Sequence, residues 1–203
     1  MRGNRKIALK AALILTGAVT TYGLIPSPEP QYEGRNLRSW LTRAETLWFG
    51  GAEARPGYDQ NQVDHAVREM GTNALPALIS MLESRDGAIK QHIISLGRVF
   101  PRWPFRPTPA SENHVRALLG FKILGPIAEP AVPALTKLLH RGEGEIAVLA
   151  SRALSRIGPA ATNAVPALVR NLSDQDIAVR SVATNALKRI DPLAAVSAGI
   201  TVG

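Results

Sequence analysis

The sequence predicts an all-α protein in which pairs of helices stack into an α-solenoid. Two consecutive segments of 33 residues, Gly125–Ile157 and Gly158–Ile190, align without a gap and share 14 identities. Self-similarity at a period of this length is typical of stacked supersecondary units. Within the second segment, apolar residues recur at spacings of three and four, which indicates one buried helical face. Aromatic residues make up only 5% of the chain, as expected where Ala and Leu pack closely spaced helices.

The last repeat shows the elements of one unit. A first helix is predicted over about Asn163–Leu172, with Pro166 in its first turn, where a missing N–H costs little. The polar break Ser173–Asp176 supplies side-chain acceptors for the first N–H groups of the next helix. The second helix is predicted over Ile177–Ile190. Residues 193–203 are expected to form a C-terminal tail.

This unit resembles a HEAT repeat. Its second helix carries the pattern V-R-x-x-A-x-x-A-L-x-x-I from Val179 to Ile190, after a proline-bearing helix and an aspartate-containing turn. The preceding unit has Ile146-Ala147 in place of Val-Arg. The resemblance covers Gln60–Pro192, most closely in the final two units, and implies a right-handed α-solenoid whose second helices line a concave face. The order GRNLRSWL, a helix, then GTNALPAL also resembles bacterial exported proteins with short HEAT-like arrays.

Earlier copies of the unit are degenerate. The segment Thr72–Leu78 resembles Thr162–Leu168, and both Ala88–Phe100 and Val115–Leu124 fit the place of the second helix that should follow. Corresponding prolines of two successive first helices lie 57 residues apart, so one 33-residue step has gained about 24 residues. We expect a Pro-rich insertion, 101–110, and an extra helix to fill this gap.

The part of the chain before these units divides into three predicted segments. Val63–Met70 is expected to be the second helix of a further partial unit, so the repeats would occupy residues 60–192. A capping helix over Arg35–Phe49 and a loop make up residues 35–59, and residues 26–34 form a Pro-rich linker.

Residues 1–25 have the pattern of a signal anchor or signal peptide. Four cations fall within the first ten residues, before the apolar run Ala11–Ile25. This run spans about 22 Å as a helix, and about 28 Å if it begins at Ile7 with Lys10 snorkelling, against a hydrocarbon core of ~30 Å. We predict an uncleaved anchor, with the N-terminus in the cytoplasm and the repeats exported. The alternatives are a cleaved signal, which leaves a secreted or periplasmic protein, and a buried N-terminal helix.

The net charge of +8 is shared between this segment and the rest of the chain. The first ten residues contribute +4, and the remainder carries 20 basic and 16 acidic residues. The second helices of the last two units hold several cations, namely Arg152, Arg156, Arg180, Lys188 and Arg189. A basic inner groove would suit an acidic peptide, a phospholipid headgroup or nucleic acid. An ordinary solvated face is the alternative reading.

The insertion supplies a second candidate binding site. Between residues 101 and 109, prolines alternate with Arg102, Trp103, Phe105 and Arg106. Prolines hold the backbone near polyproline II, and aromatic and arginine side chains are enriched at interface hot spots. The alternative is that Trp103 and Phe105 fold back and cover the irregular junction in the array.

Motifs for catalysis or metal binding are absent from the sequence. None of the four histidines lies in H-x-x-x-H or H-E-x-x-H, and the chain has no cysteine. HEAT-like metal hydroxylases use repeated His-Glu pairs, and this chain has none. Asp174, Asp176 and Arg180 are predicted to cap helices and bridge units. We therefore predict no catalytic, metal-binding or cofactor-binding residue.

The predicted function is that of a non-enzymatic protein–protein interaction scaffold, tethered to the membrane through its N-terminal helix. The sequence does not identify the protein partner. The first alternative is a cytoplasmic nucleic-acid-binding HEAT-like protein with a basic N-terminal arm, although export argues against chromosomal DNA. The second is an enzyme of a HEAT-like class.

Overall fold

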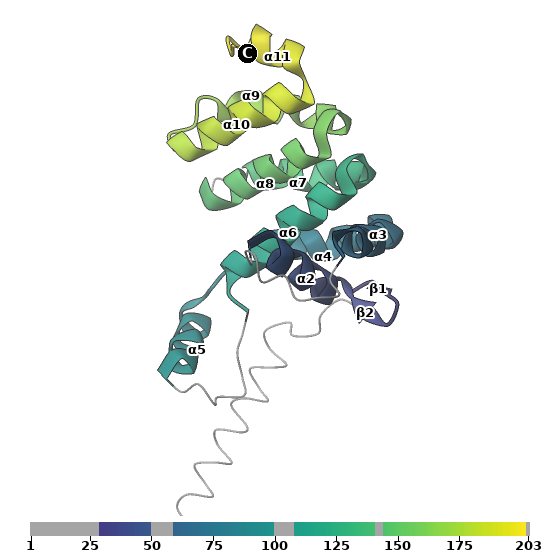
Figure 1. Ribbon diagram of the computed structural model, residues 1–203. Coiled ribbons are helices and arrows are strands. Elements are labelled where there is room, and N and C mark those ends of the chain that lie inside the picture. The colour runs from purple at the N-terminus through teal and green to yellow at the C-terminus, as the bar shows by residue number, and fades with distance from the viewer. Residues whose placement is uncertain (1–28, 50–58, 100–107, 141–143, 202–203) are drawn as a thin grey trace, which may run out of the picture.

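A computed structural model describes residues 29–49, 59–99, 108–140 and 144–201 of the chain. The structure is all-α, apart from one short hairpin, and its helices pack against one another (Figure 1). The predicted anchor, residues 1–25, lies outside the described residues. The strands are β1 (Gln31–Tyr32) and β2 (Arg35–Asn36), and the helices are α2 (Leu37–Phe49), α3 (Gln60–Met70), α4 (Leu75–Leu82), α5 (Ala88–Val99), α6 (Ala110–Leu124), α7 (Val132–His140), α8 (Gly144–Ile157), α9 (Val165–Asn171), α10 (Ile177–Ile190) and α11 (Pro192–Ser197).

Most helices belong to pairs that follow one another along the molecule. α4 packs on α6, α7 on α8, and α9 on α10. α8 also packs on both α6 and α10, so these three helices form one layer, while α7 contacts α9 in the other. α2 and α3 pack on each other and on α6 at one end, and α11 packs on α10 at the opposite end (Figure 1). We call α4, α7 and α9 the first helices, and α3, α6, α8 and α10 the second helices.

Leucine and alanine fill the space between the layers. Leu135 and Leu168 of the first helices, and Leu154 and Leu187 of the second helices, have no exposed surface. These are corresponding residues in the two aligned 33-residue segments. The sequence repeat therefore marks residues that bury their side chains in one continuous core.

The same backbone device joins each second helix to the next first helix. A glycine with positive φ ends α3, α6 and α8, at Gly71 (+54°), Gly125 (+52°) and Gly158 (+75°). A 3₁₀ segment then leads to a first helix that has proline in its first turn; these segments are η1 (Gly71–Ala74), η2 (Gly125–Ala131) and η3 (Gly158–Ala164). Glycine adopts positive φ without the steric cost that other residues incur, so it is suited to this junction.

The structure resolves which segment completes the pair with α4. The sequence offered both Ala88–Phe100 and Val115–Leu124; the helix that packs on α4 is α6, and it begins at Ala110 rather than Val115. Its extra turn is held by Asp86, whose two carboxylate oxygens accept the Ala110 N–H at 3.0 Å each. This acceptor comes from a residue 24 positions earlier, which local sequence patterns do not reveal.

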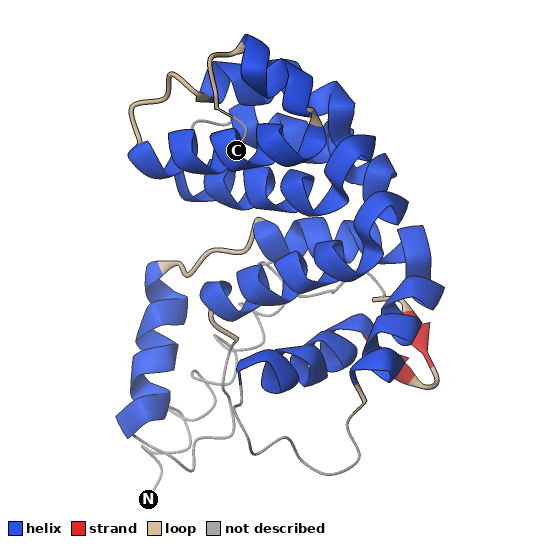
Figure 2. Cartoon of the chain, turned by 45° about the horizontal axis from the view of Figure 1, so that its top comes forward, coloured by secondary structure: helices blue, strands red, loops and turns tan. Residues whose placement is uncertain are grey.

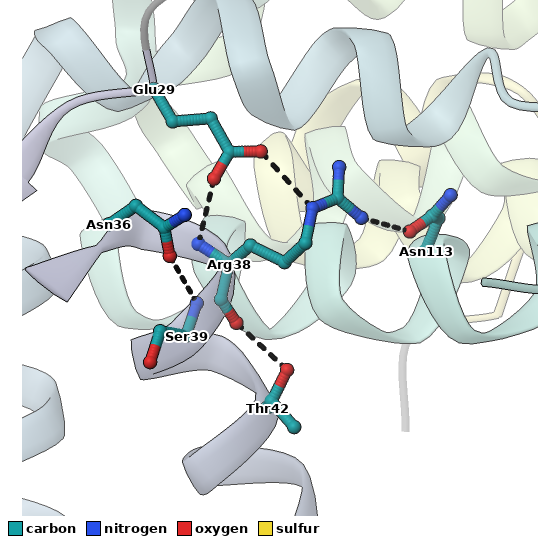
Figure 3. Close-up of polar contacts among 6 residues, drawn as sticks. All are labelled: Glu29, Asn36, Arg38, Ser39, Thr42 and Asn113. Atoms are coloured by element: carbon teal, nitrogen blue, oxygen red, sulfur yellow. Dashed lines mark hydrogen bonds and ion pairs between the residues drawn. The ribbon is translucent and has the colours of Figure 1, made fainter. Parts of the chain in front are cut away.

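The first described residues are bound to the array rather than forming a free spacer. Glu29 accepts hydrogen bonds from the N–H and Nε of Arg38, at 3.3 and 3.1 Å, and the Arg38 guanidinium donates to Asn113 of α6 at 2.6 Å (Figure 3). Residues 29–34 therefore do not behave as the predicted linker. α2 starts at Leu37, not Arg35, because residues 35–36 pair with β1. Asn36 then accepts the Ser39 N–H at 2.9 Å (Figure 3).

The end of the chain also differs from the prediction. The expected tail, residues 193–203, supplies most of α11, and Ala195 is fully buried. Asp191 ends α10 in an extended conformation, and its side chain accepts the Ala194 N–H at 2.9 Å. Asp191 and Pro192 follow the last residue of α10 and also provide the N-cap and the first-turn proline of a new helix.

One helical stretch among the described residues, Ala110–His140, is long and apolar enough to cross a membrane. It comprises α6, η2 and α7 and is broken at Gly125 by a positive φ. Within it, Phe121 and Leu135 are fully buried, and 56% of its most apolar window is covered by the rest of the molecule. Its apolar character is therefore used in the core of the array.

Candidate binding surface

The predicted basic residues lie on two adjacent second helices. Arg152 and Arg156 are exposed on α8, and on α10 Arg189 is exposed while Lys188 is half-buried. Within the described parts of the chain, none of these four side chains forms a hydrogen bond or an ion pair. Arg156 and Arg189 correspond in the aligned repeats, so packing of α8 on α10 places like charges at equivalent positions of neighbouring helices.

The structure adds Lys122, which sequence reasoning missed. Lys122 is on α6 near its C-terminus; its side chain is exposed, but the surrounding protein removes part of its hydration, which lowers the pKa of its ammonium group below the ordinary value. The positive charge of Arg156 on the next second helix lowers this pKa further, and Asp64 of α3 opposes the shift. The charges of α6 and α8 therefore act on each other directly. The degenerate early units gave no alignment that would place Lys122 beside Arg156.

A fourth second helix contributes Arg68, which the sequence also did not single out. Its Nε donates to the carbonyl oxygen of Ile123, at the end of α6, at 3.3 Å. Four second helices, α3, α6, α8 and α10, thus each carry cations near their C-terminal ends. We call this set the basic row: Arg68, Lys122, Arg152, Arg156, Lys188 and Arg189.

In α6, α8 and α10 the acidic residues lie at the other end, whereas α3 carries Glu69 in its last turn beside Arg68. Glu112 and Glu145 lie in the first turns of α6 and α8, and Asp176 caps α10 through its bond to the Ala178 N–H at 2.8 Å. Acids near helix N-termini and bases near C-termini both complement the helix dipole. The row therefore has a structural benefit in addition to any binding role, and in α6, α8 and α10 the two ends of the helix differ in charge.

The sequence offered two roles for Arg180, as a cation of the basic inner groove or as a capping residue. Arg180 is not part of the basic row. Its guanidinium donates to the carbonyl oxygens of Asp174 and Gln175, at 2.8 and 2.9 Å. Both acceptors lie in the turn before its own helix. Arg180 and Asp174 thus stabilise the connection between α9 and α10.

The second predicted site, the Pro-rich insertion, lies almost entirely outside the described residues. Arg102, Trp103, Phe105 and Arg106 are all in this part of the chain. Their role as interface residues stays a prediction, as does the alternative that the two aromatic side chains cover the junction.

The histidines whose contacts are described interact with residues nearby in the fold. His114 is buried, its Nε2 lies 2.9 Å from the carbonyl oxygen of Ser84, and its Nδ1 lies 3.5 Å from Glu145. His140 Nδ1 lies 2.7 Å from the Thr136 carbonyl oxygen, within α7. Among the described residues, no group of three or more His, Cys, Asp or Glu side chains is arranged to hold a metal ion.

Comparisons with protein families, curated proteins and solved structures return no match for this chain.

Proposed function

We propose that this protein is a HEAT-like α-solenoid scaffold, tethered by its N-terminal segment, whose basic row binds an acidic segment of a protein partner. The role is non-enzymatic. The observation that carries the proposal is the recurrence of cations at the C-terminal ends of four consecutive second helices. Paired helices, glycine-ended junctions and the 33-residue period support the HEAT-like assignment.

The spacing of the row fits a polypeptide. Packed helices lie about 8–10 Å apart, and an extended chain advances about 3.3 Å per residue. An acidic residue at every third position of an extended segment would therefore meet successive second helices. A carboxylate near Lys122 and Arg156 would offset the positive charge that these two residues place on adjacent helices.

A peptide-binding experiment on the full chain tests the proposal. A fluorescent peptide with glutamate at every third position is titrated against a peptide of the same composition with its glutamates clustered. Arg152→Glu/Arg156→Glu should weaken binding of the spaced peptide by about tenfold. Each exposed ion pair contributes about 0.2–1 kcal/mol, charge reversal adds repulsion of similar size, and tenfold corresponds to about 1.4 kcal/mol. The double variant Lys137→Glu/Arg170→Glu, on the first-helix layer, makes the same change in net charge and is the control.

Three outcomes contradict parts of this function. Equal weakening by the control variant would mean that net charge alone attracts the peptide. Equal binding of both peptides would remove the role of helix spacing. Tighter binding of a single-stranded oligonucleotide of matched charge would favour the nucleic-acid alternative. The tether is tested separately by alkaline carbonate extraction of membranes, where full recovery of the protein in the soluble fraction would exclude it.

A further inference from the structure

Helix α5 stands outside the paired helices. α4 packs directly on α6, and α5 makes no extensive contact with any described element. Both views show it projecting to one side, away from the helices that continue to α11 (Figures 1 and 2). Among the described residues, the pairing of α4 with α6 does not involve α5.

The sequence of α5 is that of an amphipathic helix. In the sequence, Ile89, Ile93 and Leu96 follow one another at spacings of four and three, which predicts one apolar helical face. Gln91 lies on the opposite face and is exposed. Lys90 forms an ion pair with Asp86 at 2.7 Å. A helix with one apolar face is suited to the boundary between lipid headgroups and acyl chains.

Two junctions meet at the first turn of α6. The N–H of Ala110 donates a hydrogen bond to Asp86, which lies just before α5. Arg38 donates a hydrogen bond to Asn113 and forms an ion pair with Glu29. Ala110 and Asn113 are three residues apart, or about 4.5 Å along the helix axis. The base of α5 and the first described residue of the chain are therefore fixed to the same end of α6.

The number of residues before Glu29 limits how far the apolar run can be from the N-terminal end of α6. Only three residues, at positions 26–28, separate Glu29 from the apolar run Ala11–Ile25. Three extended residues span at most about 11 Å. If the apolar run enters a bilayer, the first turn of α6 and the base of α5 are held close to the bilayer surface.

We propose that α5 lies along the surface of an anionic bilayer, beside the N-terminal segment, with the face of Ile89, Ile93 and Leu96 in the interfacial zone. This inference rests on the proposed tether. Charge supports it, because Arg85, Lys90 and Arg98 outnumber Asp86 over residues 85–99. The basic row is at the C-terminal end of α6, away from this contact, and stays available to a protein partner.

Single-cysteine labelling of the full chain tests the inference, because the chain has no cysteine of its own. An environment-sensitive fluorophore is attached at Ile93→Cys or Gln91→Cys on α5, at Ala18→Cys in the apolar run, or at Lys137→Cys on α7. The proteins are reconstituted into phosphatidylcholine vesicles with about one-third phosphatidylglycerol, a composition that supplies the negative surface potential. Quenching by brominated lipids then reports contact with acyl chains.

We expect strong quenching at positions 18 and 93, and at least threefold weaker quenching at positions 91 and 137. Quenching at 18 without quenching at 93 would overturn the placement of α5 and leave the tether intact. Loss of quenching at 18, with the protein recovered apart from the vesicles, would overturn the tether and this inference together. Equal quenching at 91 and 93 would overturn the surface orientation. Unchanged helical circular dichroism shows that each labelled protein is folded.

Discussion

The direct packing of α6 on α4 predicts that Gly120 cannot accept even one methyl group. A Cβ atom built at Gly120 would lie 3.3 Å from Cγ and 2.9 Å from Cδ1 of Leu78, and closer still to Cδ2. Leu78 is fully buried, so its side chain cannot move aside without disturbing the core. Leu78→Ala removes all three of these atoms. The effect of Gly120→Ala should therefore depend on whether Leu78 is present.

The expected magnitudes have opposite signs in the two backgrounds. Overpacking costs about 1–3 kcal/mol, and the better helix propensity of alanine offsets about 1 kcal/mol of it. Since three atoms are involved, we expect Gly120→Ala to lower the stability of the wild type by about 1–2 kcal/mol. In the Leu78→Ala background the clash is gone, so Gly120→Ala should raise stability by about 0.5–1 kcal/mol. The coupling energy is then about 1.5–3 kcal/mol.

Urea unfolding of the wild type, both single variants and the double variant measures this coupling. Leu78→Ala alone should cost about 2–5 kcal/mol. Additivity of the two substitutions within about 0.5 kcal/mol would refute the Gly120–Leu78 contact. It would also return α5 as the candidate partner of α4, because that contact distinguishes the two arrangements.

Three further predictions concern single sites. Gly125→Ala should lower the free energy of unfolding by about 1–3 kcal/mol through its positive φ alone, because no atom lies within 4 Å of the position of an added Cβ. Gly87 is equally open but has no positive φ, so Gly87→Ala should change this free energy by under about 0.5 kcal/mol; urea melts measure both. Leu187→Ala should cost about 2–5 kcal/mol and the neighbouring Lys188→Ala under about 0.5 kcal/mol; equal effects would mean that the buried face of α10 is wrongly placed. Burial raises the pKa of Asp86, but hydrogen bonds from Lys90 and the Ala110 N–H and the charges of Lys90 and His114 outweigh it, so the pKa lies below the usual value. The stability that Asp86 contributes is thus complete above about pH 4 and lost as pH falls through the lowered pKa, and Asp86→Asn should flatten unfolding free energies measured between about pH 5 and pH 2.

The sequence by itself determined the helical class and the bounds of the last second helix. The predicted segment Ile177–Ile190 has the bounds of α10, and the aspartate before it caps the helix as expected. These features depend on residues within a few positions of one another, such as the Asp176–Ala178 contact. The alternation of polar breaks and apolar faces is therefore readable without a structure.

Only the tertiary structure decided which helix pairs with α4 and where residues 29–34 lie. It also decided that Lys122 is close to Arg156. Both α5 and α6 have apolar faces at helical spacing, and the choice depends on Gly120 facing Leu78. The position of residues 29–34 depends on Arg38, which binds Glu29 and donates a hydrogen bond to Asn113, 75 positions later in the chain. Local patterns record which residues favour a helix, but a surface or a junction forms from side chains that only packing brings together.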